Sequence, residues 1–139
     1  MSGELTTGRL AVLAKVALAG RTVWLYALVR ARLRRSAIPQ VVEGLTRVPQ
    51  LREQSLRSAR LGRMVGRVLA IGPWRARCLH TSLVLYRLMR EQGEDAQIVI
   101  GLPNSPRDKD AHAWVELGGV DVGPPPGRGS HVELARYPA

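Results

Sequence analysis

The chain has 139 residues, a formal net charge of +10 and a hydrophobic fraction of 45%. This length suits one compact domain, and the apolar content excludes an intrinsically disordered chain. Its single cysteine excludes an intramolecular disulfide, and the opening Met-Ser-Gly-Glu lacks the basic and apolar layout of a signal peptide, so we expect a cytoplasmic protein.

The charge is divided unevenly along the chain. Residues 1–77 hold 15 Arg and Lys against 3 Glu, whereas residues 78–139 hold 6 against 8 Asp and Glu. This division predicts a cationic first half that meets an acidic peptide, a partner protein, anionic lipid or nucleic acid, and a second half with a near-neutral site. Arginines that only keep helix faces solvated would explain the same composition.

The first predicted element is a helix over residues 6–35, with apolar side chains at helical spacing. Lys15 and Arg21 lie in the middle of this segment, and their charges argue against a membrane span. Four arginines follow Trp24 near the end of the helix: Arg30, Arg32, Arg34 and Arg35. They suit the surface of an anionic bilayer, and equally the C-terminal end of a helix, whose dipole favours cations. We favour the second interpretation, so membrane contact is not the expected role of this helix.

Two more helices are predicted over residues 39–47, with Pro39 in the first turn, and over residues 55–70, ended by Gly72-Pro73. The next helix begins at Cys78 and is apolar on nearly every face up to Gly93. A helix that is apolar all round is buried, and a glycine after its last turn is typical of the C′ position.

Beyond Gly93 the apolar pattern becomes that of β-strands. Strands are predicted over residues 96–101, 111–117, 120–122 and 131–135. Gly118-Gly119 supplies the positive φ angles of a tight hairpin turn, so the third strand should return antiparallel to the second. The predicted fold class is therefore α+β, with N-terminal helices followed by a buried helix on a small antiparallel sheet. We divide the chain into a basic helical region, residues 1–70, and a core, residues 71–139.

Cys78 and His112 are the candidate catalytic residues. Free N–H groups and the helix dipole stabilise a thiolate at a helix N-terminus, and an imidazole near Cys78 could take the thiol proton. Arg75 and Arg77 add positive charge before the helix. A lone cysteine is more often an inert core residue, and its position is what favours catalysis. The spacings of one cysteine and three histidines match no zinc pattern, so we expect no metal and no cofactor.

Several motifs in the second half stand in a characteristic order: Arg77-Cys78-Leu79-His80-Thr81-Ser82, Gly93, Ile98-Val99-Ile100-Gly101, Ala111-His112-Ala113-Trp114-Val115-Glu116 and Asp121-Val122-Gly123-Pro124. In order and spacing they resemble the leader peptidase of lasso-peptide biosynthesis, a small transglutaminase-like cysteine protease of the bacteriocin- and microcin-processing type. The resemblance covers about residues 70–139.

The resemblance implies a transglutaminase- or papain-like core and a triad of Cys78 as nucleophile, His112 as base and Asp121 as third member. It implies an enzyme that removes the leader from a ribosomally made precursor peptide, after which a separate cyclase closes the macrolactam ring. It also implies a leader-binding recognition protein as partner, and the cyclase as a further one. The cationic first half would then be the docking surface.

The third member of the triad has two candidates. If Gly118-Gly119 form a two-residue turn, Asp121 faces Glu116, and His112 lies four residues further along the strand, about 13 Å away. Family members in which the aspartate aligns with position 124 differ from this chain, which has Pro124 there. A wider turn or a bulge would bring Asp121 closer, and Asp110, two residues before His112, is the alternative.

Two other functions fit parts of the sequence. One is a non-catalytic adaptor that binds a peptide or partner through its basic helices, with the Cys78 helix as core. The other is a nucleic-acid-binding module. Arginine suits phosphate contacts, but no zinc-finger, helix-turn-helix or RNP-like motif accompanies it, so we expect no nucleic-acid partner.

Overall fold

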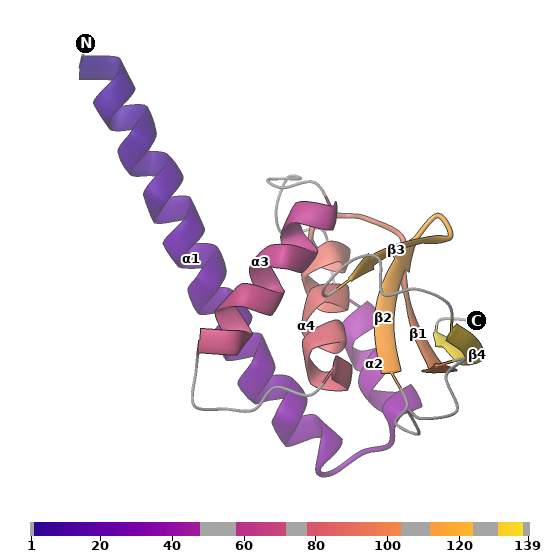
Figure 1. Cartoon of the computed structure of the whole chain (residues 1–139). Helices are drawn as coiled ribbons and strands as arrows, with labels where there is room; N and C mark the ends of the chain where they lie inside the picture. Colours follow the sequence, from indigo (N-terminus) through magenta and orange to yellow (C-terminus); the bar gives the residue numbers. More distant parts are fainter. Residues whose placement is uncertain (1, 48–57, 72–77, 104–111, 124–130, 138–139) are drawn as a thin grey trace.

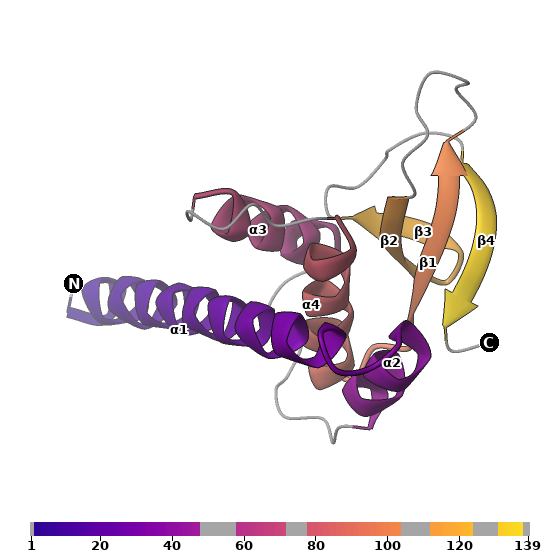
Figure 2. The same ribbon diagram turned by 90° about the horizontal axis from the view of Figure 1, so that it is seen from below.

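The computed structural model describes residues 2–47, 58–71, 78–103, 112–123 and 131–137. Within these ranges the chain forms four helices and four strands: α1 (Ser2–Leu33), α2 (Ile38–Thr46), α3 (Ser58–Ile71), α4 (Cys78–Glu91), β1 (Ala96–Pro103), β2 (His112–Leu117), β3 (Val120–Gly123) and β4 (His131–Tyr137). Helix α4 lies between the sheet on one side and α1 and α3 on the other (Figures 1 and 2). The prediction of an α+β fold with a small antiparallel sheet is confirmed.

Helix α1 has a packed second half and an exposed first half. Leu18, Leu25 and Val29 are buried in the core, whereas the N-terminal part extends beyond the rest of the molecule (Figure 1). The segment Val12–Leu33 is long and apolar enough to cross a membrane, with 28% of its most apolar window buried. Core helices of soluble proteins and signal sequences have the same properties, so this is weak evidence for a span.

The middle of α1 is joined to α4 by a buried carboxylate. Glu91, which is 1% exposed, accepts hydrogen bonds from Arg21 of α1 at 2.8 and 3.3 Å and from Arg87 of its own helix at 3.0 Å. Arg87 also donates to the carbonyl of Leu45 in α2 at 3.1 Å. The charge at Arg21 therefore has a partner inside the fold, and Glu91 and Arg87 together join three helices.

Helix α3 packs so closely on β3 that its backbone touches the strand. A Cβ added to Gly62 would lie 2.1 Å from the carbonyl oxygen of Val122. Real Cβ atoms essentially never approach so near, so only glycine allows this contact.

Helix α4 is the centre of the hydrophobic core. Its buried apolar side chains are Leu83, Val84, Leu85, Tyr86, Leu88 and Met89, which confirms the prediction of a buried helix. The helix ends at Glu91, and Gly93 follows with a φ of 79°, the left-handed conformation expected of a terminating glycine.

The strands form one antiparallel sheet in the order β3-β2-β1-β4. Gly118 and Gly119 have φ angles of 60° and 82°, so the predicted hairpin between β2 and β3 is confirmed as a tight turn with two positive φ angles. Ile98 and Val115 face α4 and lie in the core. Because side chains alternate along a strand, their neighbours Val99 and Trp114 face away from the helices.

Candidate active site

Cys78 is the first residue of α4. The first N–H groups of a helix have no partner within the helix, so the position favours an anion, as the sequence predicts. Arg75 and Arg77, which precede the helix, lie outside the described residues.

A buried hydrogen bond joins the start of α4 to the start of β2. The hydroxyl of Ser82 donates to the carbonyl oxygen of Ala113 at 2.8 Å, and the bond is buried. Cys78 lies four residues before Ser82, about one helical turn earlier. His112 immediately precedes Ala113 and is the first residue of β2. The two candidate catalytic residues are thus brought to the same end of the helix–sheet layer.

His112 is partly buried and lies directly across from Gly101 of β1. By strand alternation it shares the face of Trp114, whereas Ala113 turns towards α4. Because His112 is the terminal residue of its strand, the imidazole would approach Cys78 around the end of β2.

The close neighbours of Gly101 explain why β1 has a glycine across from His112. A Cβ on Gly101 would lie 2.8 Å from the Trp114 ring and 2.7 Å from the carbonyl oxygen of Val132. A glycine inside a predicted strand signals such a close approach, and sequence reasoning did not use this signal.

Asp121 occupies the register that a two-residue turn predicts, directly across from Glu116. The bulge in β3 falls at Val122, after Asp121, and does not move this carboxylate along β2. His112 is four residues from Glu116, about 13 Å at the usual rise of a strand. One carboxylate oxygen of Asp121 accepts a hydrogen bond from the N–H of Gly123 at 2.8 Å. Asp110, the alternative third member, lies outside the described residues.

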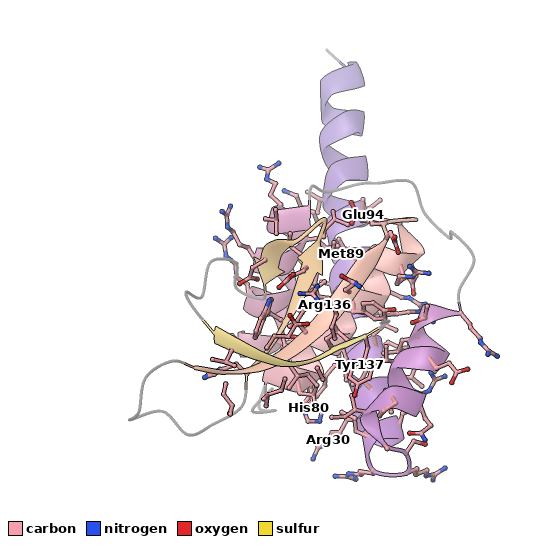
Figure 3. The ribbon with its side chains drawn as sticks, turned by 90° about the vertical axis from the view of Figure 1, so that its right-hand side faces the viewer. Arg30, His80, Met89, Glu94, Arg136 and Tyr137 are labelled. Carbon is pink, nitrogen blue, oxygen red and sulfur yellow. The ribbon has the colours of Figure 1, made fainter. Side chains whose placement is uncertain are left out.

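A polar network covers the face of the sheet that points away from the helices. Arg136 of β4 pairs with Glu116 at 3.0 Å and with Glu133 at 2.8 Å, and donates to Gln97 at 2.8 Å. Trp114 donates its indole N–H to Glu116 at 2.8 Å. The hydrogen bond to Glu133 is the main cause that raises the pKa of Arg136. Figure 3 shows Arg136 in front of the strands. The contacts of Arg136 with Glu116 and Gln97 form only when the strands pair, so no local pattern reveals them.

The histidine of α4, His80, has a structural environment. The ring of His80 packs against the ring of Tyr26 in α1, with their centres 5.9 Å apart. His80 therefore faces the helical side of the molecule. Among the described residues, no three His, Cys, Asp or Glu come together in a group that could hold a metal ion.

One comparison with known proteins gives a result. The model of the transglutaminase-like superfamily matches residues 22–134, which include the last part of α1, all of α2, α3 and α4, the first three strands and the beginning of β4. No curated protein and no solved structure matches the chain significantly. The match extends the similarity well into the first half, beyond the segments quoted from the sequence.

Proposed function

The chain belongs to the transglutaminase-like superfamily, and on this premise we propose that it is a cysteine peptidase with Cys78 as nucleophile and His112 as general base. The observation that carries the proposal is the Ser82–Ala113 hydrogen bond. It joins the first turns of the helix that begins at Cys78 to the start of the strand that begins at His112, and so supports their lying at the same end of the molecule. The transglutaminase-like domain fits a cysteine peptidase in general.

In the proposed reaction, His112 takes the thiol proton of Cys78, and the thiolate attacks the carbonyl carbon of the scissile bond. The helix N-terminus supports this step, since the free N–H groups at the start of α4 favour both the thiolate and a negative oxygen in the tetrahedral intermediate. The amine then leaves with the proton from His112, and water hydrolyses the thioester. The products are a leader with a free carboxylate and a core peptide with a free amine.

The substrate that we propose is the precursor of a lasso peptide, cut between leader and core so that a separate cyclase can use the new amine. This step rests on the resemblance of the motifs around Cys78 and His112. We also propose a leader-binding recognition protein as partner. The exposed side chains of α1 support such docking, because Val12, Leu13 and Val16 are 59%, 63% and 62% exposed, and Arg30 and Arg35 are exposed near its other end.

The orienting carboxylate stays a prediction, with Asp121 and Asp110 as candidates. The pH profile of kcat/KM tests both, because it reports ionisations in the catalytic unit that includes the orienting carboxylate. The true third member, changed to Asn, should shift the acidic limb of the profile and lower the rate. The other Asp-to-Asn variant should leave the profile in place.

The proposal is tested by incubating the protein with lasso precursors, with and without a recognition protein, and reading the products by mass. Cys78→Ala and His112→Ala should both abolish cleavage, since residues that act as one unit are not additive. His80→Gln is the matched control, a histidine of the same helix whose ring packs on Tyr26, and it should retain cleavage. If Cys78→Ala binds precursor as tightly as the unchanged protein, and Cys78 is alkylated no faster than free cysteine, the protein is an adaptor instead.

A further inference from the structure

An exposed apolar pair lies at the end of the sheet beside the candidate active site. Leu102 of β1 and Val132 of β4 face each other directly across the two strands, and they are 38% and 54% exposed. Apolar side chains of this size are usually covered, and two of them on one rung form a small continuous patch. We call these two residues the Leu102–Val132 rung.

This rung is the next one beyond the rung of Gly101 and His112. Strand alternation assigns it to the face of the sheet that carries α4, because Ile98 and Tyr137 pair on the same face and pack on the core. The Ser82–Ala113 bond puts the beginning of α4 at this end of the sheet. The Leu102–Val132 rung therefore shares both the face and the end of the sheet with Cys78.

The strand that carries Val132 is also an edge of the sheet. β4 pairs with β1 on one side, and no strand among the described residues pairs with its other side. An edge strand presents backbone N–H and C=O groups that an extended peptide can pair with. The bulge in β4 adds Leu134, which is 58% exposed, to the apolar side chains near this edge.

We propose that the β4 edge and the Leu102–Val132 rung bind an extended segment of the peptide substrate. The backbone of the segment pairs with β4, and an apolar side chain close to the scissile bond packs on Leu102 and Val132. The occupant is a substrate peptide because the patch lies at the end and on the face of the sheet where α4 begins with Cys78, one rung beyond Gly101 and His112. Two side chains also cover one residue rather than a protein interface. This inference rests on the proposed function and defines the substrate class of that site.

Peptidyl chloromethyl ketones that alkylate Cys78 test the inference. A set of tetrapeptide probes carries one leucine at successive positions on an alanine background, and the alkylation rate is read by intact mass. At one position leucine should raise the rate over the all-alanine probe by about tenfold, the selectivity that a few buried methylene groups give. Changing both Leu102→Gln and Val132→Gln should abolish that preference.

Val120→Gln is the matched control, because Val120 is 63% exposed on the other edge strand and pairs with Leu117 at the opposite end of β2. It should keep the leucine preference of the unchanged protein. The inference is overturned if the double variant keeps the leucine preference. Loss of a dimer on size exclusion in that variant, with the preference kept, would make the patch an interface between two copies of the chain instead.

The rate of alkylation by iodoacetamide separates this inference from the proposed function. If Cys78 reacts no faster than free cysteine and His112→Ala changes nothing, the peptidase itself is refuted. If Cys78 reacts fast with iodoacetamide, equally so in the double variant, and leucine gives no advantage at any position, only the substrate-binding role of the β4 edge is refuted.

Discussion

The contact between α3 and β3 makes Gly62→Ala a stringent test of the fold. The added methyl carbon would lie 2.1 Å from the carbonyl oxygen of Val122, so helix and strand must separate by roughly 1 Å to restore van der Waals contact. Overpacking a core typically costs about 1–3 kcal/mol, and we expect the upper end because the obstacle is backbone. Alanine regains about 1 kcal/mol of helix propensity over glycine. The net loss should be about 2 kcal/mol, a fall in Tm of about 6 °C for a domain of this size.

The matched control is Gly20→Ala in α1. A Cβ at Gly20 meets nothing within 4 Å, so the same change should stabilise the protein by about 0.5–1 kcal/mol through propensity alone. Urea unfolding followed by far-ultraviolet circular dichroism measures both variants against the unchanged protein. Opposite signs support the packing of α3 on β3, whereas a Gly62→Ala protein as stable as Gly20→Ala refutes it.

Two further predictions concern the buried polar groups of α4. Glu91→Ala leaves two arginines without their buried carboxylate and should lower the free energy of unfolding by about 3 kcal/mol. Glu43→Ala removes only an exposed ion pair with Arg47 and should lower it by less than about 0.5 kcal/mol. Equal losses in urea unfolding would contradict this. Burial raises the pKa of Tyr86 above its ordinary value, partly offset by the hydrogen bond with Thr46. Because the unfolded state loses this proton first, stability should fall above about pH 10 by up to about 1.4 kcal/mol per pH unit. Tyr86→Phe should make that decline shallower, and an unchanged slope would show that Tyr86 does not contribute.

The sequence predicts the elements well because their signals are local. Pro39 in a first turn, Gly93 after a last turn and Gly118-Gly119 between two strands each specify a backbone conformation that depends on a few neighbouring residues. The change from helical to alternating apolar spacing after Gly93 separates the helices from the sheet for the same reason.

The candidate site was predicted only in part. The sequence indicates Cys78 and His112 as a pair and gives the register of Asp121 through the turn. It does not give the Ser82–Ala113 hydrogen bond that joins helix and strand. In the sequence Ser82 is only a polar residue in a buried helix, and its partner lies 31 residues further along the chain. It also does not give the Leu102–Val132 rung, since that pair exists only once β4 lies beside β1.

By itself, then, the sequence determined the type and order of the helices and strands, with ends that differ from the observed ones by up to four residues, and which residues could carry thiol chemistry. The tertiary structure alone decided the strand order β3-β2-β1-β4, the contact of Gly62 with Val122, and the pairing of Glu91 with Arg21, 70 residues away. The physical reason is that backbone preferences act over a few residues. Partners across the fold are selected by burial, shape and charge only when distant segments pack together.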